Sequence, residues 1–363
     1  MSQREVGEMH SLSLKEIECE ARQHLDPAVY DFIAGGADDE MTLRANEAAF
    51  ARIGLVPRVL RGSGAPKLDL TLLGCQASMP VIIAPTAFHR LAHPNGERAT
   101  ARAAAAAKTI LTVSMASTVA IEEVAAAARE VDPEASLWFQ LYLQPDLGFT
   151  EALVRRAEAA GCAALVVTVD SAAFGRRERD LRNGLRDLPE GMCCENLREP
   201  GRPRQIVFSP DLSWEHFDWL RKTTALKIVL KGVVHPEDAK IAVRRGANAL
   251  QVSNHGGRQL DTIPATLELL PAIVDAVGGD VPLILDGGVR RGTDAVKALA
   301  LGATAVAIGR PVLWGLAAAG EDGVSKVLEM LRAELAQALI LCGCRSRHEL
   351  TRDLLHFRVH ERW

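Results

Sequence analysis

The chain has 363 residues, with 42 Lys and Arg against 46 Asp and Glu, which gives a formal net charge of −4. Hydrophobic residues make up 48% and charged residues 24%, a composition that excludes the unfolded and fibrous classes. Near-neutral charge and very short basic runs provide no attractive field for a polyanion. We therefore expect no nucleic acid and no anionic lipid as a partner.

The two terminal segments predict a cytoplasmic protein. Charged residues such as Arg4, Glu5 and Glu8 stand where a signal peptide needs a continuous apolar run. No run of about 18 apolar residues occurs, and the C-terminus lacks the Ser-Lys-Leu type of address. Seven cysteines without a Cys-x-x-Cys pair favour reduced thiols over a disulfide framework or a zinc site.

In chain order, helical spacing predicts an N-terminal helical segment over residues 1–75, with helices at 14–24, 27–33 and 42–50. From 76 to 346, apolar runs rich in Val, Ile and Leu alternate with Ala-rich helical segments, for example 151–160, 236–245 and 293–301. The eight predicted strands are 81–84, 110–114, 137–141, 164–169, 227–230, 249–252, 283–285 and 305–308. Residues 347–363 form a C-terminal tail.

Reactive side chains stand at the end of every predicted strand. They are Thr86, Ser114, Gln140 and Tyr142, Asp170, Lys231, His255 and Arg258, Asp286, and Arg310. A (β/α)8 barrel brings all eight strand ends to one rim, whereas an open sheet divides them between two edges. Continuous apolarity also fits parallel strands covered on both faces. The sequence therefore predicts an α/β fold, a (β/α)8 TIM barrel with an N-terminal helical segment and an inserted loop after strand 4.

That inserted rim loop covers about residues 184–210 and is rich in Gly, Pro and charge. It is too irregular for a regular element, and long loops at a barrel rim are often lids, although a linker without a role is the alternative. Its charged residues, Arg186, Asp187 and Glu190 among them, argue against attachment to a membrane.

Two glycine-rich segments predict a phosphate site. Asp286-Gly287-Gly288-Val289-Arg290 follows the seventh strand, and Gly309-Arg310 follows the eighth. Glycines expose backbone N–H groups, arginines add charge, and these two loops are where barrels commonly hold a phosphate. Either segment alone is equally consistent with a tight turn. No G-x-G-x-x-G opens a first βα unit, so a Rossmann dinucleotide site is disfavoured.

A third glycine-rich turn carries acid–base chemistry. His255 can take a proton near neutral pH, and Arg258 offers a guanidinium fork for a carboxylate. Asp170 could hold the imidazole, the alternative being a helix N-cap. A metal is not expected, because no H-E-x-x-H occurs and Pro94 and Gly96 place the His89/His93 pair in a turn.

With these segments together, residues 12–346 resemble the FMN-dependent 2-hydroxy acid oxidase and dehydrogenase family, which includes glycolate oxidase, long-chain hydroxy acid oxidase, hydroxymandelate oxidase and lactate oxidase. The most specific segment is SNHGGRQLD at 253–261. It is supported by IAPTAFHRLAHPNGE at 83–97, FQLY at 139–142, TVD at 168–170, GRRERDLRN at 175–183, LKG at 230–232 and LDGGVRRGTD at 285–294.

The resemblance implies FMN as cofactor and a homotetramer. The residues it implies for the flavin ring and ribityl chain are Ala84, Thr86, Ala87, Ser114, Gln140, Thr168, Lys231 and Ser253. Those implied for ribityl and phosphate are Asp286, Gly287, Gly288, Arg290, Gly309 and Arg310. Arg258 and Arg177 would bind the substrate carboxylate, Tyr142 would donate its hydroxyl, and His255 would act as base with Asp170 behind it. Whether the base takes the α-proton or the hydroxyl proton is open.

Two positions depart from the small-substrate members of that family. Phe32 stands where they carry Tyr, and Ala116 stands where glycolate oxidase has Trp over the substrate side chain. Both changes favour a bulky or aromatic (S)-2-hydroxy acid of the mandelate or 4-hydroxymandelate type, oxidised to the 2-oxo acid with O2 reduced to H2O2. The alternatives are a dehydrogenase with another acceptor, an oxidase of a peptide-derived or carrier-bound hydroxy acid, and a flavin-binding protein without catalysis.

Overall fold

The computed structural model describes residues 10–62, 64–185, 188–199 and 202–357. Arg186 and Asp187 of the charged rim loop, the N-terminal Arg4, Glu5 and Glu8, and residues 358–363 of the tail lie outside the described residues.

Eight parallel strands close into a barrel, and each falls within one of the eight predicted runs or extends it by one residue. They are β4 (Val81–Ile83), β5 (Leu111–Val113), β6 (Leu137–Leu141), β7 (Ala164–Thr168), β10 (Lys227–Lys231), β11 (Ala249–Val252), β12 (Leu283–Asp286) and β13 (Ala305–Ile308). Neighbours in the barrel follow chain order, and β13 pairs with β4 to close the ring. The predicted (β/α)8 TIM barrel is confirmed.

Helices cover the outside of the barrel. They are α5 (Gly96–Ala106), α6 (Ile121–Val131), α7 (Leu147–Ala159), α9 (Trp214–Thr223), α10 (Pro236–Arg244), α11 (Thr266–Val277), α12 (Gly292–Ala300) and α13 (Arg310–Cys342). The predicted segment at 151–160 is α7, which starts four positions earlier because the Asp146 carboxylate accepts the Phe149 N–H at 3.0 Å. α13 is bent at Ala319 and Gly320, where the backbone leaves helical angles.

The inside of the barrel is filled by alternate strand residues such as Ile82, Trp138 and Val166. An antiparallel hairpin of β2 (Leu70–Leu72) and β3 (Cys75–Ala77) packs its buried face onto this cluster. Trp138 donates its indole N–H to Cys75 Sγ at 3.3 Å. The boundary expected at residue 75 thus falls inside β3, because the hairpin shares its core with the strands.

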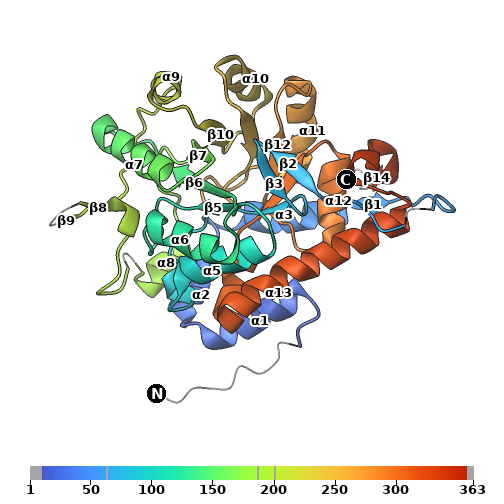
Figure 1. Cartoon of the computed structure of the whole chain (residues 1–363), viewed down its shortest axis with the longest axis horizontal. Helices are drawn as coiled ribbons and strands as arrows, with labels where there is room; N and C mark the ends of the chain where they lie inside the picture. The colour runs from blue at the N-terminus through green and yellow to red at the C-terminus, as the bar shows by residue number, and fades with distance from the viewer. Residues whose placement is uncertain (1–9, 63, 186–187, 200–201, 358–363) are drawn as a thin grey trace.

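The N-terminal segment forms α1 (Leu14–His24), α2 (Pro27–Ala34) and α3 (Met41–Ala51), within a residue of the predicted helices. Ser13 and Asp26 cap the first two through the Glu16 and Ala28 N–H groups. α1 packs along α13 (Figure 1). β1 (Ile53–Leu55) pairs antiparallel with β14 (Leu355–Phe357), which joins this segment to the C-terminal tail.

The rim loop contains more regular structure than its composition predicts. It follows α8 (Glu178–Asn183) and contains a 3-10 turn, η1 (Glu195–Leu197), and two short paired strands, β8 (Arg198–Glu199) and β9 (Arg202–Pro203). Such short elements carry no periodic signal. Buried Asn196 accepts the Ile121 N–H at 2.8 Å and donates to the Ser114 carbonyl at 3.2 Å, so the loop is fastened to the barrel. No described helix is long and apolar enough to cross a bilayer.

Leu72→Ala tests the hairpin as part of the core. The Leu72 side chain is 1% exposed, so its truncation should lower the free energy of unfolding by about 2 to 4 kcal/mol. Thr71→Ala on the exposed face of the same strand is the control and should change it by less than about 0.5 kcal/mol. Urea unfolding of both FMN-loaded variants measures the difference, and equal stabilities would contradict this packing.

Candidate active site

One cavity opens at the carboxyl ends of the barrel strands, and it gathers all but two of the predicted site residues. Those lining it are Phe32, Ala84, Thr86, Ala87, Ser114, Ala116, Gln140, Tyr142, Thr168, Arg177, Lys231, His255, Arg258, Asp286, Gly287, Gly288, Arg290, Gly309 and Arg310. The other two lie behind the wall. Asp170 is behind His255, as expected, but Ser253 is fully buried and does not line the cavity. Its hydroxyl instead accepts the His255 N–H at 3.1 Å.

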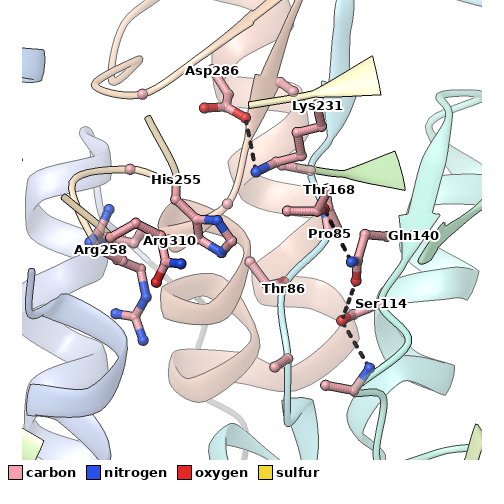
Figure 2. A pocket seen from close by; sticks show the side chains of 18 of the residues that line it. Pro85, Thr86, Ser114, Gln140, Thr168, Lys231, His255, Arg258, Asp286 and Arg310 are labelled. Atoms are coloured by element: carbon pink, nitrogen blue, oxygen red, sulfur yellow. Dashed lines mark hydrogen bonds and ion pairs between the residues drawn. The ribbon is translucent and has the colours of Figure 1, made fainter. Parts of the chain in front are cut away.

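His255 and Asp170 form the acid–base pair of the site. The imidazole Nδ1 lies 2.8 Å from Asp170 Oδ1, which leaves Nε2 for the cavity. Figure 2 shows the His255 ring among the residues that line this cavity. Asp170 caps no helix, since the next one begins at Glu178. The His255 backbone has φ +59°, a conformation that is costly for a residue with a side chain and is typical of functional sites.

Charge in this pair is fixed by burial and by nearby groups. Burial lowers the pKa of His255 and outweighs the opposing effect of the Asp170 carboxylate. Burial alone would raise the pKa of Asp170, but the neighbouring His255 and Lys231 bring it down to about 2. At neutral pH the pair is therefore a neutral imidazole held by an ionised carboxylate, the state required of a general base.

Two guanidinium groups converge on the carboxyl end of α2. Arg258 Nη1 donates to the carbonyls of Phe32 at 2.7 Å and Gly35 at 3.0 Å. Arg310 donates through Nε to Ile33 at 3.0 Å and through Nη2 to Gly35 at 2.8 Å. These carbonyls are the negative end of the helix dipole. Burial lowers the pKa of both arginines, that of Arg310 to about 10, but a guanidinium group in a protein stays protonated at neutral pH.

Arg177 is the third guanidinium of the cavity. It stacks over the Phe174 ring at 4.2 Å and lies 3.9 Å from Asp180. Its side chain is 10% exposed, and its Nε has no hydrogen-bond partner among the described residues. A buried guanidinium N–H without a partner is costly, so this wall is suited to an anionic ligand.

A row of buried polar side chains crosses the floor of the cavity. Ser114 donates to Gln140 at 3.1 Å, and the Gln140 amide donates to Thr168 at 3.1 Å (Figure 2). Lys231 Nζ lies 4.0 Å from Asp286 Oδ2, and its side chain is only 5% exposed, so it is no surface charge. Asp286 Oδ1 is buried without a partner among the described residues.

The predicted phosphate loops adjoin this floor. Gly287 and Gly288 have φ of +96° and +86°, and a Cβ on Gly288 would come within 2.2 Å of the Asn46 carbonyl oxygen, so only glycine fits. α13 starts at Arg310, and the first N–H groups of a helix have no partner within it. Arg290 pairs with Glu47 at 2.8 Å and lies over the Trp314 ring at 4.8 Å.

The cavity has an aromatic wall, of which the sequence predicted only Phe32 and Tyr142. Phe88 stacks on Phe32 with ring centroids 5.6 Å apart, Phe208 meets Tyr142 edge-on at 5.2 Å, and Phe174 lies 5.7 Å from Phe208. Four of the nine Phe residues of the chain line this cavity. Phe32 belongs to α2, whereas Phe88, Phe174 and Phe208 come from three separate loops, and an isolated aromatic residue in a loop has no periodic signal.

His89 and His93 do not form a metal site. Residues His89–Ala92 form a short helix, α4, rather than the expected turn. The His89 imidazole bonds Thr86 at 2.7 Å and Thr100 at 2.9 Å. Within the described ranges, no group of three His, Cys, Asp or Glu side chains could hold a metal ion.

Comparison with known proteins identifies the family. The model of the FMN-dependent dehydrogenase family matches residues 21–357. The chain belongs to this family. Relatives include a peroxisomal (S)-2-hydroxy-acid oxidase of Oryza sativa subsp. japonica, 46% identical over 94% of this chain and 95% of that protein. An L-lactate oxidase of Nostoc sp. is 46% identical over 95% of this chain and 98% of that protein.

Solved structures of mandelate oxidase have the same fold. One, with (S)-2-phenylpropionate, is 44% identical with a TM-score of 0.88 and covers 95% of this chain and 98% of that one. This chain is therefore an FMN-dependent enzyme, and the donor set fits the cofactor. Arginines and glycine loops suit its phosphate, the unpartnered Asp286 Oδ1 suits a ribityl hydroxyl, and the Lys231 charge suits the flavin ring.

Gly288→Ala tests the phosphate loop. Its Cβ cannot fit against Asn46, so the loop must move, and we expect the FMN dissociation constant to rise by at least about tenfold. Gly279→Ala is a matched control, since Gly279 has φ +89° but nothing within 4 Å of an added Cβ. The measurement is FMN fluorescence during reconstitution of the apoprotein. Equal affinities of the two variants would show that the loop does not hold the cofactor.

Proposed function

We propose that this protein oxidises a bulky, aromatic (S)-2-hydroxy acid, of the mandelate or 4-hydroxymandelate type, to the 2-oxo acid, and that O2 is reduced to H2O2. The observation that carries the proposal is the aromatic wall of Phe32, Phe88, Phe174 and Phe208 beside Arg177 and Arg258. Identities of 46% to small-acid oxidases and 44% to mandelate oxidase are too close to separate the substrates.

The shape of the cavity supports an aryl side chain. Ala116 lines the cavity with a single methyl group, and Tyr142 and Phe208 meet edge-on in the same wall. Aromatic rings prefer such offset and edge-on neighbours, and each well-placed pair adds roughly 0.5 to 1.5 kcal/mol beyond the buried area. A substrate of the size of glycolate would leave most of this apolar wall in contact with water.

The substrate carboxylate binds to Arg258 and Arg177. Both are buried and charged, and a planar guanidinium matches a carboxylate with two parallel N–H donors. The carbonyls at the end of α2 fix Arg258 by accepting two hydrogen bonds from its Nη1. Burial raises the pKa of Tyr142, so its hydroxyl stays protonated and can donate to the reacting oxygen.

Proton removal falls to His255. Its Nδ1 is occupied by Asp170, so Nε2 takes the proton, either from the α-carbon or from the hydroxyl, and the ionised carboxylate stabilises the imidazolium that forms. When bound, FMN supplies the two-electron acceptor that O2 reoxidises to give H2O2. Lys231 would face the flavin ring, and the phosphate would lie against Gly288, Gly309 and Arg310.

We further propose that Ala84, Ala87, Ser114, Gln140 and Thr168 hold the ring and ribityl chain, with Asp286 on a ribityl hydroxyl and Arg290 near the phosphate. Their support is that they line one cavity around a continuous hydrogen-bonded floor. The homotetramer and the cytoplasmic location stay predictions.

The pH dependence tests the base. Neutral His255 is the active form and burial holds its pKa below 6.5, so kcat/KM should fall only as pH drops through a pKa below 6.5. Asp170→Asn removes the charge that raises this pKa, so the acid limb should move to lower pH. Its maximal rate should fall by roughly 100-fold or more, because the imidazolium loses its partner. An acid limb with a pKa above 6.5 in the wild type, or an unchanged maximal rate in Asp170→Asn, contradicts the assignment.

The function itself is tested by anaerobic stopped-flow reduction of the holoenzyme with (S)-mandelate, 4-hydroxymandelate, 2-hydroxyoctanoate, lactate and glycolate, followed by air. We expect the aromatic acids to bleach the flavin with the highest kcat/KM and air to restore the colour rapidly. Faster bleaching by glycolate would refute the aromatic substrate. Bleaching with very slow reoxidation in air would instead indicate a dehydrogenase with another acceptor.

Phe208→Ala, with Val207→Ala as its control, tests whether the aromatic wall selects the substrate side chain. Phe208 lines the cavity, so its truncation should lower kcat/KM for (S)-mandelate by about tenfold and leave glycolate nearly unchanged. Val207 is adjacent but 53% exposed and outside the lining, so its truncation should change neither. Equal losses for both acids in Phe208→Ala would mean that the wall does not select the side chain.

A further inference from the structure

His89 is a buried, titratable residue that the proposed reaction does not use. Its side chain is enclosed under the cavity wall, and the residue is 3% exposed. Nε2 lies 2.7 Å from Thr86 Oγ1, and Nδ1 lies 2.9 Å from Thr100 Oγ1 in α5. Thr86 lines the cofactor cavity, whereas Thr100 is fully buried and does not. The imidazole thus connects the protein interior with one hydroxyl of the cavity wall.

Burial fixes the protonation state of this imidazole. The pKa of His89 is lowered by desolvation, against the smaller opposing effect of Glu97, so the ring is neutral at physiological pH. A neutral imidazole has one N–H donor and one lone-pair acceptor. One of the two threonines must therefore donate to His89, and the other must accept from it.

The position of Thr100 decides which one donates. Among the described residues its hydroxyl has no hydrogen-bond partner other than His89 Nδ1. If Nδ1 carried the proton, the Thr100 O–H would be a buried donor without an acceptor, which is unfavourable. Thr100 therefore donates to Nδ1, Nε2–H donates to Thr86, and the Thr86 O–H is left to donate into the cavity.

Further hydrogen bonds hold the backbone that carries the His89 ring. The backbone N–H of His89 donates to Glu97 Oε1 at 3.1 Å, and the backbone N–H of Thr118 donates to the same oxygen at 2.8 Å. Thr118 Oγ1 also donates to Glu97 Oε2 at 2.8 Å. Both Glu97 and Thr118 are buried, so the one-turn helix α4 that carries His89 has a fixed position.

We propose that His89 is a positioning residue that keeps the Thr86 hydroxyl turned as a hydrogen-bond donor toward FMN. Flavin rings present carbonyl oxygens and ring nitrogens as acceptors, so a fixed donor on this wall strengthens cofactor binding and changes the electronic environment of the ring. This role concerns the cofactor alone and is independent of which hydroxy acid is the substrate.

The experiment measures the FMN dissociation constant and the visible absorption spectrum of bound FMN in three variants, His89→Leu, Thr86→Val and the double variant. Each single variant should weaken FMN binding by about tenfold, the usual effect of one lost hydrogen bond, and shift the spectrum in the same direction. The double variant should be no weaker than either single one, because both remove the same donor. Fully additive losses, or a His89→Leu protein with unchanged affinity and spectrum, overturn the proposal.

Two further variants distinguish a specific effect on the Thr86 hydroxyl from a general disturbance of the surrounding structure. Thr118→Val removes a buried hydroxyl from the same Glu97 network without touching the imidazole, so FMN affinity and spectrum should stay as in the wild type. His89→Gln keeps an amide donor for Thr86 and should recover most of the affinity. A loss in Thr118→Val as large as in His89→Leu would overturn the proposal. Should His89→Leu fail to fold, Thr86→Val decides, since unchanged FMN binding there excludes a donated hydrogen bond.

Discussion

The site depends on burying three guanidinium groups, those of Arg177, Arg258 and Arg310, in one cavity. Like charges in a medium of low polarity repel strongly, and each loses its hydration. The chain offsets this cost with the carboxyl end of α2, whose carbonyls accept from Arg258 and Arg310. The remaining N–H groups face the cavity and suit two anions, the phosphate of FMN and a substrate carboxylate. The charge is thus held in place before any ligand arrives.

Of the N-terminal helices, α2 lines the cavity, and α3 supports the site from outside it. α3 is tied to the turn that carries His255, because Asn46 and Asn254 exchange two buried amide hydrogen bonds of 2.9 Å. The Asp261 carboxylate accepts the Thr42 N–H at 2.8 Å and the Met41 N–H at 3.1 Å at the start of α3. Asn254 and Asp261 therefore tie both ends of the glycine-rich segment to α3, and His255 lies between them with its positive φ.

Features that depend on short stretches of sequence could be predicted, and features that depend on distant contacts could not. Strand and helix periodicity placed all eight barrel strands, and their order brought Lys231, His255 and Asp286 to one rim. The pairing of β1 with β14 joins segments about 300 residues apart, and no local pattern marks it. Ser253 follows β11 as predicted, but its hydroxyl is buried and accepts the His255 N–H, and no local pattern in the sequence indicates this contact.

A single carbonyl oxygen connects the two halves of the cavity. The Gly35 carbonyl accepts from Arg258 on the proposed substrate side at 3.0 Å and from Arg310 on the phosphate side at 2.8 Å. A Cβ on Gly35 would come within 2.6 Å of the Asp31 carbonyl oxygen, so only glycine fits at the C-cap of α2. Because both arginines donate to this one oxygen, the C-terminal end of α2 fixes the two guanidinium groups relative to each other before either ligand binds.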